Sequence, residues 1–182
     1  MSSNIILIGM PGSGKSTLSK VLSSNFSCES LDLDHLIEKK AGKSIPQLFS
    51  EKGEAHFREL EQLELQKLST YTSNYILATG GGTPCFYNNM ELLNKLGITV
   101  YLKWATEDLL KNLKNTDLNK RPLFAGLSQS ELIDKLSLQL NDRAHFYNQS
   151  NITVELDNKS NQQQVLDEIE LKILRWMSSF PK

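Results

Sequence analysis

The feature that most constrains this sequence is a glycine-rich segment between an apolar run and a helical one. Residues 9–16, GMPGSGKS, match the pattern G-x-x-x-x-G-K-[ST]. The apolar run Asn4–Ile8 precedes the segment, and Lys15–Asn25 follows it with apolar residues at helical spacing. Such a loop turns backbone N–H groups toward an anion, and the positive end of the next helix points to the same place. We therefore predict a nucleoside triphosphate site; a chance glycine-rich turn is the alternative.

The parts of this loop have different expected tasks. The Lys15 ammonium reaches the β- and γ-phosphates, and the Ser16 hydroxyl ligates a Mg²⁺ ion that also carries phosphate oxygens. The expected nucleotide contacts are Gly12, Ser13, Gly14, Lys15, Ser16 and Thr17.

Length and charge exclude several other classes of protein. The chain has 182 residues, which suits one domain, and 20 basic residues nearly balance 21 acidic ones. Nucleic acid and anionic lipid are therefore not expected partners. We expect neither a membrane span nor a secretory signal. Cys28 and Cys85 match neither a disulfide framework nor a metal-ligand spacing, so we expect a reduced, cytoplasmic protein.

Short apolar runs alternate with longer helical patterns along the chain. The expected strands are Asn4–Ile8, Ser30–Leu33, Tyr75–Ala78, Ile98–Leu102 and Ile152–Leu156. The expected helices are Lys15–Asn25, His35–Ala41, Ile45–Lys52, Glu54–Thr70 (with Leu60, Leu63, Leu65 and Leu68 on its apolar face), Asn88–Leu96, Glu107–Leu113, Ser130–Tyr147 and Gln162–Met177. This alternation predicts an α/β fold in which helices cover both faces of a mostly parallel sheet.

The triphosphate site leaves the reaction open. A GTPase switch normally carries N-K-x-D, and both N-K pairs here, in residues 94–97 and 119–122, lack the final aspartate. A motor or a large ATPase would need a longer chain. A small-molecule kinase is therefore the leading class.

Candidate acceptor-side groups follow two of the predicted strands. Asp32 and Asp34 alternate along an extended segment, so they share a face. One can hold the water shell of a metal while the other takes a hydroxyl proton; alternatively, Asp34 caps the helix His35–Ala41. Gly80-Gly81-Gly82 permits close backbone approach to a ligand or forms a flexible turn.

Arginine is scarce, with four residues against 16 lysines, and a planar guanidinium binds carboxylates and phosphates in a way that lysine cannot. Arg58 is a candidate, although it could simply pair with Glu54 or Glu61 on its own helix. Arg121 lies in the long segment 115–128 and is either a lid residue or part of a solvated turn. Arg143 lies one helical turn before Tyr147, and its stem could instead pack on the core.

Together these segments resemble the shikimate kinase family. The resemblance runs from Ile5 to about Asp157. It rests on GMPGSGKST (9–17), LDLD (31–34), FRxxE (57–61), ATGGG (78–82), RPLFAG (121–126) and RxxxY (143–147). It implies a three-layer P-loop kinase fold of the nucleoside-monophosphate-kinase type, with a five-stranded parallel sheet, a substrate-binding helical region at about 33–61 and a lid at about 114–128.

The resemblance also implies residue roles on the acceptor side. Arg58 and Arg143 would hold the carboxylate of shikimate. Asp34 would act as the base for the attacking 3-hydroxyl, or only orient it, and Gly81 would offer a backbone contact.

On the donor side, the resemblance assigns Asp32 to the surroundings of Mg²⁺ and Arg121 to the lid that closes over ATP. One departure concerns adenine: Lys114 stands where the family often has an arginine. Another is Asn148-Gln149, which replaces an acidic residue after the RxxxY motif.

The expected reaction is therefore transfer of the ATP γ-phosphoryl group to shikimate, giving shikimate 3-phosphate and ADP on the route to chorismate and the aromatic amino acids. We expect a monomer whose partners are these small molecules. Two rivals are a kinase for another polyhydroxylated acid such as gluconate and a nonenzymatic module that binds nucleotide or a partner. The second should have lost Lys15, Asp34 or an acceptor arginine, and none is missing.

Overall fold

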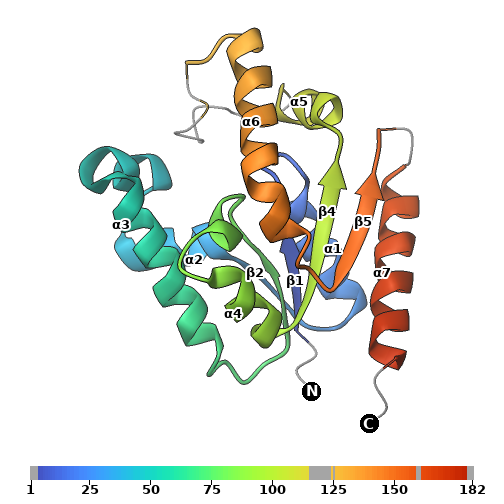
Figure 1. Ribbon diagram of the computed structural model, residues 1–182. Coiled ribbons are helices and arrows are strands. Elements are labelled where there is room, and N and C mark those ends of the chain that lie inside the picture. Colours follow the sequence, from blue (N-terminus) through green and yellow to red (C-terminus); the bar gives the residue numbers. More distant parts are fainter. Residues whose placement is uncertain (1–3, 115–123, 125, 159–160, 180–182) are drawn as a thin grey trace.

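A computed structural model describes residues 4–114, 124, 126–158 and 161–179 of the protein. Strands and helices alternate along most of the chain (Figure 1). The strands are β1 (Ile5–Ile8), β2 (Glu29–Asp32), β3 (Tyr75–Ala78), β4 (Ile98–Trp104) and β5 (Ile152–Leu156). The helices are α1 (Lys15–Asn25), α2 (Leu33–Ala41), α3 (Ile45–Leu68), the 3₁₀ turn η1 (Thr83–Cys85), α4 (Asn89–Leu96), α5 (Thr106–Lys114), α6 (Gln129–Tyr147) and α7 (Gln162–Ser178).

The five strands form one sheet in the order β2-β3-β1-β4-β5, and all four pairings are parallel. The predicted parallel sheet is therefore confirmed. Because parallel strands end at the same edge, the segments that follow β1, β2 and β3 meet there. These segments are the phosphate loop, Asp32–Asp34 and Gly80–Gly82, and the strand order makes them neighbours.

Helices cover both faces of the sheet, as Figure 1 shows. Successive residues of β1 point to opposite faces: Ile6 and Ile8 pack with α2, α3, α4, α5 and α6, whereas Ile5 and Leu7 pack with α1 and α7. Trp104 contacts both cores. The continuous apolar runs of β1 and β3 are what a strand buried on both faces requires.

The second strand and its helix differ from the sequence prediction. The strand ends at Asp32, and α2 begins already at Leu33, because the Asp32 carboxylate accepts from the backbone N–H of His35 and caps the helix. Asp32 and Asp34 therefore do not share one face of an extended segment, and the residue that caps is Asp32 rather than Asp34. Both corrections leave the two carboxylates two residues apart at the start of α2, at the same sheet edge.

The two helices predicted before and after Gly53 are continuous in α3 apart from a break at Gly53 itself, where φ is 79°. The predicted apolar face is wrong at Leu63, which is 47% exposed, although Leu65 and Leu68 are buried. Within the described part of the chain, no helix combines the length and the hydrophobicity that crossing a membrane requires.

Candidate functional site

A cavity of about 310 Å³ opens where the segments that follow β1, β2 and β3 meet. Its wall combines the phosphate loop, the two aspartates after β2 and the glycines after β3. The lining residues are Pro11, Gly12, Gly14, Lys15, Ser16, Thr17, Asp32, Asp34, Thr79, Gly80 and Gly81. The predicted donor loop and the predicted Asp34 and Gly81 are thus brought to one cavity.

The phosphate loop requires glycine at Gly12 for two reasons. Its φ of 83° is a conformation that other residues rarely adopt, and a Cβ there would lie 2.7 Å from Leu113 Cγ of α5. Helix α1 begins directly after Gly14, and no side chain caps its first turn. The open N–H groups of that turn and the helix dipole favour a bound anion.

Lys15 is held under the loop rather than pointing into solvent. Its ammonium donates to Gly9 O (2.8 Å), Met10 O (2.9 Å) and Ser13 Oγ (3.1 Å), and the residue is only 7% exposed. Trp104 Nε1 supports the same loop by donating to Ser13 O at 3.2 Å. A positive charge is therefore held in the cavity wall by two backbone carbonyls and a hydroxyl of the same loop.

Ser16 and Asp32 place a hydroxyl and a carboxylate side by side on the cavity wall. Ser16 Oγ donates to Asp32 Oδ2 at 2.6 Å across the α1–β2 junction. Among the described residues no group of three or more His, Cys, Asp or Glu side chains is placed to hold a metal. A hydroxyl beside one carboxylate fits Mg²⁺, which keeps several waters and takes further oxygens from phosphates.

The glycines after β3 lie between the two halves of the site. A Cβ on Gly81 would lie 2.6 Å from Pro11 Cδ of the phosphate loop, and one on Gly82 would lie 2.7 Å from Arg58 Nη2. Asp34 is near the same segment, since its Oδ1 would be 3.3 Å from a Cβ on Gly80. The glycine segment thus touches the phosphate loop on one side and a guanidinium on the other, and bulkier residues would push them apart.

Arg58 is held by two glutamates, as its helical spacing allowed. Nε and Nη2 donate to Glu54 Oε1 at 3.1 and 2.7 Å, and Nη1 donates to Glu61 Oε2 at 2.7 Å. Glu61 is fully buried and also accepts from the Thr83 hydroxyl. Burial raises the pKa of Glu61, and Arg58 and Thr83 offset this only in part.

Arg143 approaches the same place from α6. Arg58 and Arg143 both lie beside the Cys85 thiol: burial raises the pKa of Cys85 to about 11, and the two guanidinium groups limit the rise. One turn after Arg143, the buried Tyr147 hydroxyl donates to Gly81 O at 2.5 Å and contacts Met10 Sδ at 3.6 Å. The two predicted acceptor arginines, on different helices, thus both act electrostatically on Cys85, although neither contributes to the cavity wall.

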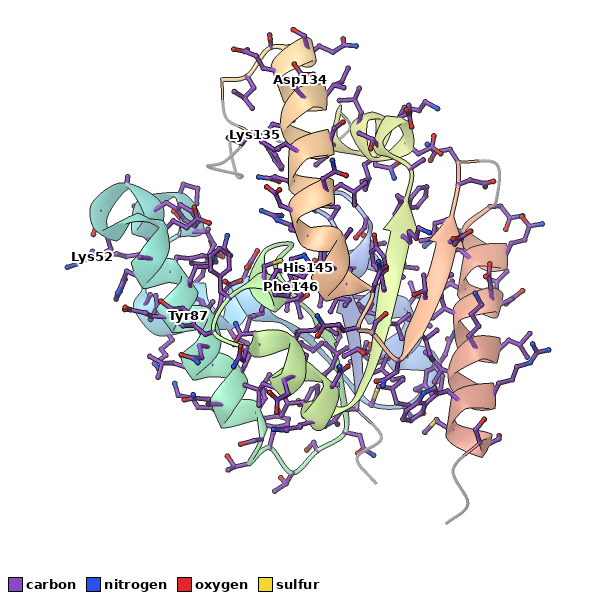
Figure 2. All side chains as sticks on the ribbon, in the orientation of Figure 1. Lys52, Tyr87, Asp134, Lys135, His145 and Phe146 are labelled. Carbon is purple, nitrogen blue, oxygen red and sulfur yellow. The ribbon has the colours of Figure 1, made fainter. Side chains whose placement is uncertain are left out.

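Several contacts at this site were not predicted. Thr83 anchors Glu61, and Phe86 places its ring 4.6 Å from the Arg58 guanidinium carbon. Figure 2 shows Tyr87 beside α3, where Tyr87 O accepts from Gln62. Tyr87 and Asn88 adopt positive φ values, which hold this turn against α3. Only the glycines before it signalled an unusual turn in the sequence.

The lid prediction lies largely outside the described residues. Arg121 is among those not described, and so is most of the segment 114–128. Phe124 of the same motif is buried in the core on the α3 and α6 side of the sheet. Helix α5, which leads into the segment, packs on the phosphate loop through Leu113 and Gly12.

Comparison with known proteins gives one consistent family. A family profile described as shikimate kinase matches residues 11–174. The shikimate kinase of Bacteroides thetaiotaomicron is 36% identical over 166 residues, covering 91% of this chain and 94% of that protein. The shikimate kinase of Flavobacterium johnsoniae is 39% identical over 168 residues, covering 92% and 97%.

Solved structures agree. Shikimate kinase from Acinetobacter baumannii in complex with shikimate superposes with a TM-score of 0.85 at 32% identity, covering 100% of this chain and 97% of that one. The Bacteroides thetaiotaomicron crystal structure gives 0.84 at 35% identity, covering 97% of each chain. The profile spans most of the sequence and the relatives are similar over nearly their whole length, so this chain belongs to the shikimate kinase family.

Proposed function

We propose that this protein transfers the γ-phosphoryl group of ATP to the 3-hydroxyl of shikimate. The observation that carries the proposal is the junction at Gly80–Gly82, where Gly81 touches Pro11 of the phosphate loop and Gly82 touches Arg58. A triphosphate loop and a carboxylate-binding arginine are thus separated by a single backbone segment. The family supports the same reaction, since its members are ATP-dependent small-molecule kinases.

On the donor side, the N–H groups of residues 12–17 and the Lys15 ammonium bind the β- and γ-phosphates. Lys15 would exchange some of its contacts with the Gly9 and Met10 carbonyls for phosphate oxygens, which carry more negative charge. Ser16 and Asp32 would hold Mg²⁺, Asp32 through water; when bound, the ion neutralises charge on the phosphates.

On the acceptor side, Arg58 and Arg143 bind the carboxylate of shikimate, and the Gly81 backbone contacts its ring. The Gly81 carbonyl is engaged by Tyr147, so the contact would come from the Gly81 N–H. Asp34, on the cavity wall, orients the 3-hydroxyl and accepts its proton. The hydroxyl oxygen bonds to the γ-phosphorus as the bond from that phosphorus to the β–γ bridging oxygen breaks, and ADP leaves with that oxygen.

The remaining assignments rest on sequence. Arg121 in the RPLFAG motif closes over ATP and stabilises charge on the transferring group, with 114–128 as the lid and 33–61 as the substrate-binding region of a single domain. We also propose that the protein acts as a monomer. Cys28 and Cys85 are free thiols, which suits a reducing, cytoplasmic setting.

A coupled ADP-release assay with ATP, Mg²⁺ and a panel of acids tests the proposal. We expect turnover with shikimate and much less with gluconate, and ³¹P NMR should identify a monoester at the 3-position. Preference for gluconate would favour a kinase of another polyhydroxylated acid. Nucleotide binding without turnover of any acid would indicate a nonenzymatic module.

A further inference from the structure

The two glutamates that hold Arg58 are not equivalent. The Glu61 side chain is 0% exposed and is anchored a second time by the Thr83 hydroxyl. The Glu54 side chain is 43% exposed, and among the described residues its hydrogen bonds are those from Arg58. Moving Glu61 away from Arg58 would leave a buried carboxylate without its charged partner. The Glu54 side chain, in contrast, can rotate toward solvent without losing packing.

Glu54 occupies a particular edge of the guanidinium. Its Oε1 accepts from both Nε and Nη2, which form the edge that binds carboxylates with two parallel hydrogen bonds. The other directions are closed by permanent parts of the fold. Nη1 donates to buried Glu61, Gly82 lies against the guanidinium, and the Phe86 ring centroid is 4.6 Å from its central carbon. The Arg58 side chain is only 5% exposed as a result.

The backbone at Glu54 allows its carboxylate to move away from Arg58. Glu54 directly follows Gly53, the break in α3, so it stands in the first turn of the second helical stretch. Gly53 has a φ of 79°, and nothing lies within 4 Å of where its Cβ would be. Glu54 is therefore carried at the start of a helical stretch, next to a glycine with open surroundings, whereas Glu61 lies two turns further into the helix.

We propose that Glu54 is an internal competitor for the acceptor carboxylate: shikimate binds Arg58 by displacing Glu54 from the Nε–Nη2 edge. This inference rests on the proposed function, which makes Arg58 a ligand of an acid. Adding a third carboxylate beside Glu54 and Glu61 would gather three negative charges on one guanidinium. Exchange keeps two charges there, and Arg143, which shares the surroundings of Cys85 with Arg58, faces the incoming acid.

Displacement of Glu54 by shikimate predicts a difference between acidic and neutral ligands. A Glu54 that only positioned Arg58 would not produce this difference. A neutral analogue, such as the methyl ester of shikimate, cannot displace Glu54, so it binds with the Arg58–Glu54 pair intact. Removing the competitor therefore favours the acid and leaves the ester unaffected. If Glu54 instead oriented Arg58 for the substrate, removing it would weaken the binding of the acid.

The test is calorimetric titration of Glu54→Gln with shikimate and with its methyl ester, in the presence of ADP and Mg²⁺. We expect the dissociation constant of the acid to fall by about three- to tenfold, the range of a partly exposed charged pair, with that of the ester unchanged. Glu54→Ala should behave alike. Glu59→Gln, on the exposed side of the same helix, is the matched control and should bind both compounds as wild type does.

Unchanged or weaker acid binding in both Glu54 variants would overturn the exchange, while wild-type phosphorylation of shikimate would leave the proposed function intact. An equal gain for acid and ester would also overturn it, because the effect would then not depend on the carboxylate. If wild-type protein neither binds nor phosphorylates shikimate, the proposed function itself fails, and the exchange fails with it.

Discussion

The donor and acceptor halves of the site are built in different ways. The proposed donor half is mainly one continuous segment, residues 9–17, with Lys15 held by the backbone of that same segment. The acceptor half draws on α2, α3, α6 and the glycines after β3, and its charges sit on side chains paired with other side chains. A backbone site depends on a few glycines, whereas a side-chain site depends on partners far apart in sequence.

This difference matters for how the halves respond to change. Phosphate is common to all nucleotides, so a local, rigid loop serves the donor half. Recognition of one particular acid needs groups arranged around a ring, and these come from several elements. Substitutions should therefore separate the halves cleanly: donor variants should lose turnover, and acceptor variants should lose affinity for one substrate.

The largest expected effect is in the donor half. Lys15→Met removes the buried ammonium, and we expect kcat to fall about a thousandfold, the upper range for loss of one preorganised donor. Steady-state ADP release measures kcat, and shikimate affinity should stay near wild type in a titration. A comparable loss of shikimate affinity would show that the two halves are not separable.

A smaller effect is expected for Arg58→Lys in the acceptor half. Lysine keeps the charge but lacks the planar group with which Arg58 can bind Glu61 and the substrate carboxylate at once, so the KM for shikimate should rise about 10- to 100-fold. The KM for ATP should stay within a factor of two or so of wild type, on the same reasoning. An unchanged KM for shikimate would show that Arg58 does not bind the carboxylate of the substrate.

The smallest effect is expected where the halves meet. Tyr147→Phe deletes the hydroxyl that bridges Gly81 O and Met10 Sδ, and the free energy of unfolding should fall by about 1 kcal/mol because one buried hydrogen bond is lost. Urea denaturation measures this, with exposed Tyr87→Phe as the control. We expect the KM values for ATP and for shikimate to stay unchanged. The kcat should drop a few-fold, which corresponds to a rise of about 1 kcal/mol in the activation free energy. A change confined to one KM would assign Tyr147 to that half alone.

Much of the fold could be predicted from the sequence, because buried parallel strands read as short apolar runs. The bounds of Tyr75–Ala78, Ile152–Leu156 and Lys15–Asn25 agree with the structure, and the parallel sheet follows from their alternation. The start of α2 was missed because a strand and a capped helix compete at Asp32, and the cap was assigned to the wrong aspartate.

The site was predictable where it is local. Residues 9–17 are recognisable as one motif, whereas the contact of Glu61 with Thr83 of η1 depends on how α3 packs against that turn. The contacts of Phe86 and Tyr147 likewise join segments that no spacing rule connects. Resemblance to the family named Arg58 and Arg143, but the two glutamates that pair with Arg58 became distinguishable only through their burial.

The burial of Cys85 beside the proposed acceptor site determines how this thiol would react with a covalent inhibitor. A thiol with a pKa of about 11 is almost wholly protonated at neutral pH, and its thiolate fraction grows about tenfold for each pH unit up to that value. An electrophile aimed at it would meet very little of the reactive thiolate at neutral pH. A covalent inhibitor directed at Cys85 would therefore need a carboxylate that binds Arg58 and Arg143, because its bond to the thiol would form slowly.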